Sequence, residues 1–403
     1  MRWELNRTSI VNLLSSILIT GLALHSFPNS ADETLANEPA VYSVSQEEQA
    51  YTRAIEAIES SGGAYAPELS EPLLSLALTL QSQGRHTQAI ALFRRGIHLT
   101  RVNEGLYCAQ QVPLLQGEIV SHLAIQDYAM VDERQDYLYR VQTRSIEAGD
   151  ALTDALMQQA QWQYAAYQLG LGPDGYIRLL NMSELYGLAL RNVFATEDVE
   201  ETSATLLPPL QGMLETQYLI AGYAWQESDR AFDEDERPNE SLRQFSAYRT
   251  QSYRQGNNII EAIARIERNV AQTQVMLGDW RLWNGRTKSA WQAYQKAEAE
   301  LAGEDDAQVQ LQKVFGQPLA LPDIAGLTPL PPAVDPKEDE IVLEFTVDAK
   351  GKVQDLERID DNDDHDKQAK QLMNRLRKTT FRPRFADGQP QETEKMVKAF
   401  DVQ

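Results

Sequence analysis

The chain has 403 residues, of which 42% are hydrophobic and 24% charged, and its 59 acidic residues outnumber its 37 basic ones. This composition excludes a globally disordered chain, because it holds enough apolar side chains to bury a core in each of two or three domains. The formal net charge of −22 would repel nucleic-acid phosphates, so we expect no nucleic-acid partner. A single cysteine, Cys108, leaves no partner for a disulfide within the chain. The sequence indicates no metal site, no cofactor and no catalytic residue, and it predicts that the protein is not an enzyme.

Residues 1–31 have the layout of a secretory signal peptide. Arg2 and Arg7 precede an apolar run from Ile10 to Leu24, and a polar, acidic stretch follows Pro28. The run would form about 22 Å of helix, which is short of a hydrocarbon core of about 30 Å and therefore favours cleavage over anchoring. We expect export to the periplasm, with an uncleaved inner-membrane anchor and an ordinary buried helix as the alternatives.

From residue 45 to residue 312 the pattern predicts paired helices. Apolar side chains return every three or four positions, and glycines and prolines interrupt them at intervals typical of helical hairpins. Two windows place their small and aromatic residues at the same spacing: Leu76, Ala77, Gly84, Ala89, Phe93 and Gly96 in the first, and Leu277, Gly278, Gly285, Ala290, Tyr294 and Ala297 in the second. Small side chains let the two helices of a pair approach closely, and the aromatic residue fills the space to the next pair.

These two windows resemble tetratricopeptide repeats, although the early tryptophan and the closing proline of that family are missing from both. The resemblance implies an α-solenoid that binds a protein or peptide in its concave groove, and it implies no reaction.

Residues 313–337 form a predicted linker. Six of the chain's 17 prolines fall between Pro318 and Pro336, which favours an extended, semi-rigid backbone. Lysine first appears at position 288 and becomes frequent only after residue 336, so the composition also changes here.

Residues 338–403 predict a small α+β domain of order ββαβ. Ile341 to Val347 alternates apolar and polar side chains, and a hairpin turn at Gly351 leads to a second strand, Val353 to Ile359. Asp366 to Lys378 has helical spacing, and Glu394 to Val402 alternates well enough for a closing strand. The predicted fold class is therefore mostly α, a helical-hairpin solenoid followed by a ββαβ domain.

This region resembles the C-terminal domain of TonB-type proteins. The residues that carry the resemblance are Phe345, Val347, Gly351, Val353, Phe381, Pro383, Gly388 and Pro390. The resemblance implies a module that grips an extended segment of a partner, typically by adding it as a strand to the exposed sheet edge. The alternative is a folded domain whose edge is covered and which has no partner.

Six residues are candidates for contact with a partner: Asp279, Trp283, Arg382, Arg384, Lys395 and Val397. The first two lie among the tryptophans of the second repeat-like window, which either pack the hairpin or line the groove as a binding hot spot. Arg382 and Arg384 belong to a basic cluster that could meet an acidic partner, the chain's own acidic helices or only solvent. Lys395 and Val397 lie on the predicted closing strand.

Together these features predict a non-catalytic cell-envelope adaptor of a Gram-negative bacterium. The expected partners are envelope proteins or peptides, including an outer-membrane or inner-membrane protein complex. One alternative is a TonB-type energy transducer, although such proteins carry a serine four residues before a histidine in the anchor and here Gly21 precedes His25. The other is an envelope enzyme whose site lies unrecognised in the helical region.

Overall fold

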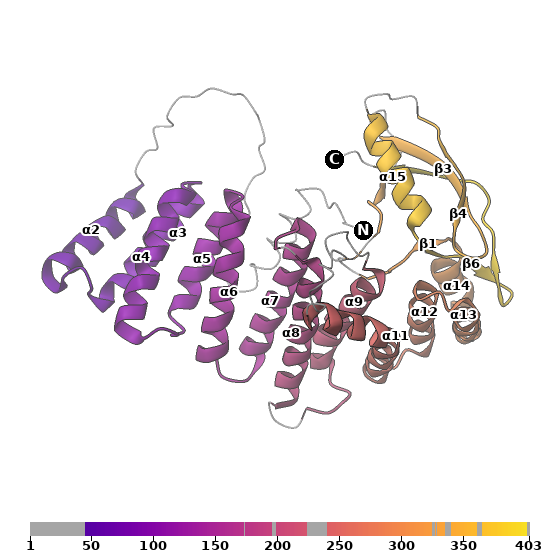
Figure 1. Cartoon of the computed structure of the whole chain (residues 1–403), viewed down its shortest axis with the longest axis horizontal. Helices are drawn as coiled ribbons and strands as arrows, with labels where there is room; N and C mark the ends of the chain where they lie inside the picture. Colours follow the sequence, from indigo (N-terminus) through magenta and orange to yellow (C-terminus); the bar gives the residue numbers. More distant parts are fainter. Residues whose placement is uncertain are drawn as a thin grey trace, which may run out of the picture. The chain divides into compact units, whose positions relative to one another are not determined.

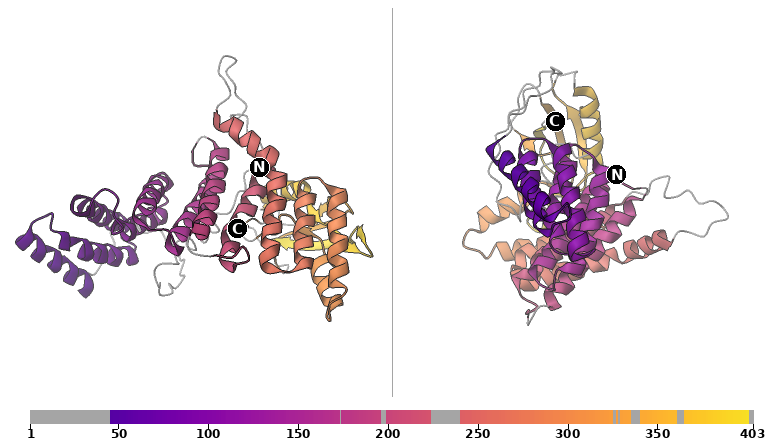
Figure 2. Two further views of the ribbon diagram at one scale, coloured as in Figure 1. Left: turned by 90° about the horizontal axis from the view of Figure 1, so that it is seen from below. Right: turned by 90° about the vertical axis from the view of Figure 1, so that its left-hand side faces the viewer.

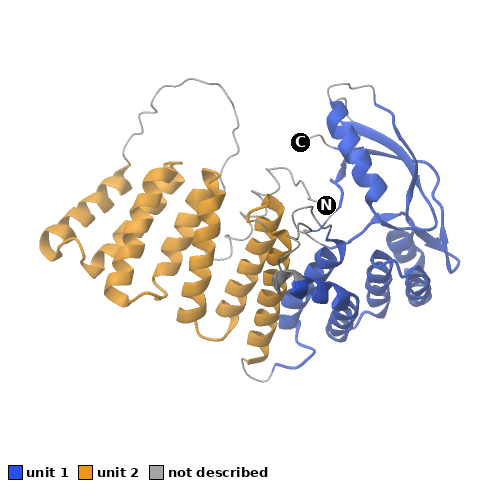
Figure 3. Ribbon diagram, viewed as in Figure 1, with its two compact units in different colours: residues 1–3, 198–403 blue, residues 4–197 orange. Residues whose placement is uncertain are grey.

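A computed structural model describes residues 45–172, 174–195, 199–223, 240–324, 327, 329–334, 340–360 and 365–400. Over these residues the chain is mostly helical, with a small strand-containing region near its C-terminal end (Figure 1). The predicted signal peptide at residues 1–31 lies outside them. No helix in this described part is both long and apolar enough to cross a membrane. The chain divides into two compact units, residues 4–197 and residues 198–403 together with 1–3 (Figure 3).

The first unit is built from helices that each pack against the next one in the chain. They are α2 (Gln46–Gly62), α3 (Ser70–Ser82), α4 (His86–Glu104), α5 (Gln111–Ala124), α6 (Tyr128–Ser145), α7 (Asp150–Leu169) and α8 (Gly175–Ala195), with a short 3₁₀ turn, η2 (Pro67–Leu69), before α3. Gly84 turns the chain between α3 and α4 with φ of 74°, a conformation that glycine adopts without strain. The paired helices that the sequence predicts are therefore present.

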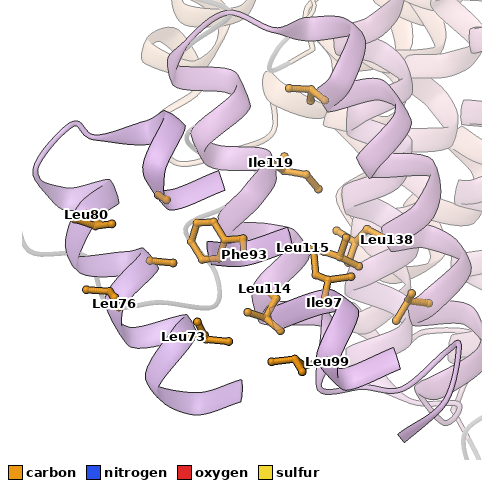
Figure 4. Packing of buried hydrophobic residues seen from close by; sticks show 14 of the residues in the cluster. Leu73, Leu76, Leu80, Phe93, Ile97, Leu99, Leu114, Leu115, Ile119 and Leu138 are labelled. Carbon is orange, nitrogen blue, oxygen red and sulfur yellow. The ribbon is translucent and has the colours of Figure 1, made fainter. Parts of the chain in front are cut away.

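The core of the first unit lies between these helices (Figure 4). Leu73 and Leu76 from α3 and Phe93 from α4 are buried in it, together with residues of α5. A Cβ atom placed on Gly117 would lie 2.4 Å from the Phe93 ring, so only glycine leaves room for the ring there. Aromatic rings thus fill the spaces that small residues leave open.

The second unit begins with further helices: η3 (Ala204–Leu206), α9 (Leu207–Gly222), α11 (Glu240–Glu267), α12 (Val270–Trp283), α13 (Thr287–Leu301) and α14 (Ala307–Phe315). Consecutive helices from α9 to α14 again pack together. A Cβ atom on Gly278 would lie 2.2 Å from the ring of Tyr294, which is fully buried between α12 and α13. This contact lies in the second repeat-like window and fits the close approach expected there.

The strands of the second unit are short except for the first hairpin. They are β1 (Leu319–Ala320), β2 (Ala333–Val334), β3 (Ile341–Val347), β4 (Val353–Arg358), β5 (Phe381–Arg382), β6 (Arg384–Ala386), β7 (Gln389–Gln391) and β8 (Met396–Phe400), with helix α15 (Asp366–Lys378) after β4. They form three antiparallel sheets, namely β1-β5, β2-β8-β3-β4 and β6-β7. Helix α15 covers one face of the four-stranded sheet (Figure 2), where Leu372 and Leu376 share a core with Leu343 and Phe345.

The proline-rich segment 313–337 is more structured than an extended spacer. Helix α14 continues to Phe315, β1 pairs with β5, and β2 pairs with β8. Leu321 and Leu327 are buried, because leucines between prolines still gain free energy when they leave water. The described part of this segment is thus fastened to the C-terminal strands at two places.

Candidate functional site

Two of the six candidate residues, Asp279 on α12 and Arg382 on β5, lie against each other inside the second unit. The Arg382 Nε donates to Asp279 Oδ1 at 2.9 Å and the Nη2 donates to Oδ2 at 2.6 Å. Asp279 is 5% exposed and Arg382 is 4% exposed. A bidentate pair of this kind combines strong hydrogen bonds with a fixed relative orientation of its partners.

Other groups complete the hydrogen bonding of this buried pair. The Tyr294 hydroxyl donates to Asp279 Oδ1 at 2.7 Å, and Arg382 Nη1 donates to the Val314 carbonyl at 3.1 Å. The half-exposed Asp323 carboxylate lies 3.3 Å from Nη2. Burial alone would lower the pKa of Arg382, but the Asp279 and Asp323 carboxylates raise it above its usual value. Burial, reinforced by the Asp279 charge, raises the pKa of Tyr294 well above its usual value. Because both pKa values are raised, Arg382 stays charged and Tyr294 stays neutral near neutral pH, which suits holding two elements together.

The β6–β7 hairpin strengthens the same attachment between the C-terminal strands and the last helices. Phe385 lies in the core of α13 and α14, with its ring centroid 5.7 Å from that of Tyr294 and 5.6 Å from that of Phe315. At the hairpin tip, Gly388 N–H donates to Glu298 Oε2 at 2.8 Å and its carbonyl accepts from Gln295 Nε2 at 2.8 Å. The β6–β7 hairpin and the last helices thus share one core, whereas the four-stranded sheet and α15 have a core of their own.

Three of the six residues predicted to contact a partner are used in packing within the second unit. Asp279 and Arg382 are occupied by each other, so we do not propose them as partner-binding residues. Trp283 is partly buried, with its ring 5.8 Å from that of Tyr218, and a Cβ atom on Gly222 would lie 2.9 Å from it. Trp283 ends α12 and packs against α9 and against the core that α12 shares with α13, so it takes part in packing, one of the two alternatives that the sequence left open.

The other three candidates, Arg384, Lys395 and Val397, are exposed. Arg384 lies on β6, outside the four-stranded sheet. Lys395 immediately precedes β8 and its Nζ lies 2.6 Å from Glu344 Oε1 on β3. Val397 lies within β8 and is 50% exposed. The four-stranded sheet therefore brings Lys395 and Val397 together and leaves Arg384 on a separate hairpin.

The outer edge of β4 is protected against strand addition. The pairing of β3 with β4 is interrupted by an irregularity between Glu344 and Thr346, and Asp355 opposite it has φ of 48°. Gln354, Asp355 and Glu357 are exposed on this strand. Bulges and charged side chains are the usual means by which a sheet edge avoids pairing with another chain.

Among the residues that the structure describes, the outer edge of β8 is covered at one end only. β2 pairs with Ala399 and Phe400 at one end of β8. The Ile359 N–H donates to the Val342 carbonyl, so the backbone polar groups of Val342 face β4. Successive residues in a strand direct these groups to opposite sides, so those of Leu343 face its β8 partner, Lys398. Val397, the neighbour of Lys398, therefore directs its N–H and C=O away from β3, and no described residue pairs with them. The sequence predicted this strand, but nothing in it predicted the cover by β2, because a two-residue strand has no periodicity to detect.

No protein-family model matches the sequence, and comparison with the curated proteins finds no match. Across the part of the chain that the structure describes, no three His, Cys, Asp or Glu residues gather closely enough to hold a metal ion.

Proposed function

We propose that this chain is a non-catalytic cell-envelope adaptor, exported to the periplasm, that binds proteins or peptides. Its helical pairs serve as a tetratricopeptide-like solenoid scaffold, and its C-terminal region serves as a TonB-like ββαβ module that takes an extended segment of an envelope protein as an additional strand. The observation that carries the proposal is the backbone of Val397, which faces outward on β8 beside a two-residue cover.

The packing of the helical pairs supports the scaffold. In both repeat-like windows a buried aromatic ring lies over a glycine of a neighbouring helix: Phe93 over Gly117, and Tyr294 over Gly278. Such contacts set the spacing between the helices. Scaffolds of stacked helical pairs commonly present extended surfaces to other proteins.

The difference between the two sheet edges supports the binding mode. The β4 edge carries an irregularity in its pairing and three exposed polar or charged side chains, whereas β8 carries the exposed Lys398, the half-exposed Val397 and an outward-facing backbone. An extended peptide that pairs with this edge gains main-chain hydrogen bonds, and alternate side chains supply specificity.

The proposal is tested by blocking the edge without removing the domain. Deletion of residues 338–403 would expose the core around Tyr294 and Phe315, so a point variant is sharper. V397P removes an outward-facing N–H and leaves the β3–β8 hydrogen bonds intact, whereas V397T alters the side chain and keeps the N–H. We expect V397P to retain the wild-type melting temperature and to lose the proteins that co-purify from an envelope extract, and V397T to keep them.

A folding reference completes this experiment. The N–H of Lys398 faces β3, so K398P should lower the melting temperature where V397P does not. A V397P chain that is stably folded and still captures the wild-type set of proteins would refute strand addition at β8.

A further inference from the structure

Three arginines of the first unit gather around two tyrosines near the end of α4 and along α6. The guanidinium carbons of Arg101 and Arg140 lie 5.9 Å and 5.8 Å from the centre of the Tyr137 ring. That of Arg144 lies 4.0 Å from the centre of the Tyr107 ring. All three arginines are exposed, whereas both tyrosines are partly buried against the core.

These arginines differ from most of the other described arginines in the same unit. Five arginines of the unit each contact a carboxylate: Arg85, Arg94, Arg95, Arg134 and Arg178. Arg101, Arg140 and Arg144 contact none among the residues described here. In a chain with 22 more acidic than basic residues, three such guanidinium groups side by side depart from the prevailing pattern. A guanidinium that lies over an aromatic ring keeps its N–H groups available for a carboxylate.

Apolar side chains adjoin the arginines. Leu106 is 48% exposed, and its carbonyl accepts a hydrogen bond from the Tyr137 hydroxyl at 3.2 Å. Val102, next to Arg101, is 55% exposed. The Tyr137 hydroxyl also donates to Gln111 Oε1 at 2.7 Å, which fixes the ring between its two arginines. The surface therefore combines rigid aromatic rings, arginines and exposed aliphatic groups, the combination that dominates the energetics of protein interfaces.

We propose that this arginine–tyrosine surface, formed by Arg101, Leu106, Tyr107, Tyr137, Arg140 and Arg144, binds an acidic segment of a partner protein in which carboxylates are interspersed with apolar side chains. Charge complementarity selects the partner: the guanidinium groups bind carboxylates, while the exposed Leu106 covers an apolar side chain. The surface shares no residue with the β8 edge, so its function is independent of strand addition there.

The test uses the full chain and a short fluorescein-labelled peptide that repeats Asp-Glu-Leu-Asp-Glu-Phe, with a matched peptide that carries Asn and Gln in place of the acids. Fluorescence anisotropy should show binding of the acidic peptide that weakens as salt rises from about 50 mM to about 300 mM. The neutral peptide should bind at least about tenfold more weakly, because one desolvated charge-assisted contact corresponds to about that factor.

Two double variants with the same change in net charge locate the binding. R140Q/R144Q should weaken the acidic peptide about tenfold or more, whereas R53Q/R191Q, at two exposed arginines elsewhere in the unit, should change it less than about twofold. R140K/R144K should bind the acidic peptide with an affinity between those of R140Q/R144Q and the wild type, because lysine keeps the charge but lacks the planar guanidinium that holds a carboxylate through two N–H groups. All of these side chains are exposed, so an unchanged circular dichroism spectrum and melting temperature should accompany each variant.

Three results would overturn the proposal. One is equal weakening by the two double variants, which would indicate a general charge effect. Another is equal affinity for the acidic and neutral peptides. The third is a wild-type dimer, seen by sedimentation, that R140Q/R144Q dissociates, which would assign the surface to contact with a second copy. None of these measurements uses the V397P variant, so binding at the arginine–tyrosine surface and strand addition at β8 are tested independently.

Discussion

Replacement of Arg382 tests whether the buried ion pair holds the C-terminal strands to the last helices. R382M removes two charge-assisted hydrogen bonds to Asp279 and one bond to the Val314 carbonyl. It leaves the Asp279 carboxylate, 5% exposed, with the Tyr294 hydroxyl as its remaining donor. Breaking a buried pair from one side costs about 3–5 kcal/mol, because the remaining charge is uncompensated. The half-exposed Asp323 adds less than about 1 kcal/mol.

The double variant D279N/R382M separates the ion pair from simple loss of packing. The asparagine amide introduced by D279N would still accept the hydrogen bond of Tyr294, and no buried charge would remain. We therefore expect the double variant to lose only about 1–3 kcal/mol, less than R382M alone, with a coupling of about 2 kcal/mol or more between the two sites.

Hydrogen–deuterium exchange of residues 381–400 measures these free energies directly in the second unit, and urea unfolding of the full chain gives a second reading. A loss below about 1 kcal/mol for R382M would refute the reasoning. So would a double variant whose loss equals the sum of the two single losses, because the two residues would then act independently.

Three further predictions follow from the packing, from the partly buried Glu215 and from the N-terminal segment. G117A should destabilise the first unit by about 1–3 kcal/mol in urea unfolding, because its Cβ would lie 2.4 Å from the Phe93 ring. G187A is the control: its Cβ would lie 3.6 Å from the end of the flexible Arg191 side chain. It should stabilise helix α8 by up to about 1 kcal/mol. Burial raises the pKa of Glu215 from 4.5 to about 7, so its contribution is fully present below pH 4.5 and is lost as the pH rises through 7. At about 1.4 kcal/mol per pH unit the loss is at most about 3.5 kcal/mol. Unfolding of E215Q should lack this dependence between those pH values, and parallel curves for both proteins would contradict the prediction. N-terminal sequencing of the protein from the periplasm should find residues 1–31 removed, and an intact N-terminus would favour the anchored alternative.

The helical pairs could be predicted from the sequence because their signals are local. Ala77, Ala89 and Phe93 fall within 17 positions of one another, and a periodicity of three to four residues is visible in any such window. The same holds for Ile341–Val347, where the alternation marks the range of β3. These patterns depend on neighbours along the chain and on nothing else.

The pairing of Asp279 with Arg382 could not be predicted in this way. Each residue stands out in the sequence, Asp279 as an acid directly before Trp280 and Arg382 as a base between a phenylalanine and a proline, but 103 positions separate them. Charge alone fits an external partner as well as an internal one, and only the tertiary fold distinguishes the two. The short strands β1 and β2 were missed for a related reason, because proline-rich sequence predicts extended backbone without indicating what the backbone pairs with.

The fastening of the proline-rich segment has a mechanical consequence. β1 and β2 secure that segment to β5 and β8, and Arg382 and Phe385 join the strands to α12, α13 and α14. A pulling force on a ligand bound beside β8 would therefore be transmitted directly to these helices, without prior extension of the described part of the proline-rich segment. We therefore expect the C-terminal strands and the last helical pair to move as one rigid body under force.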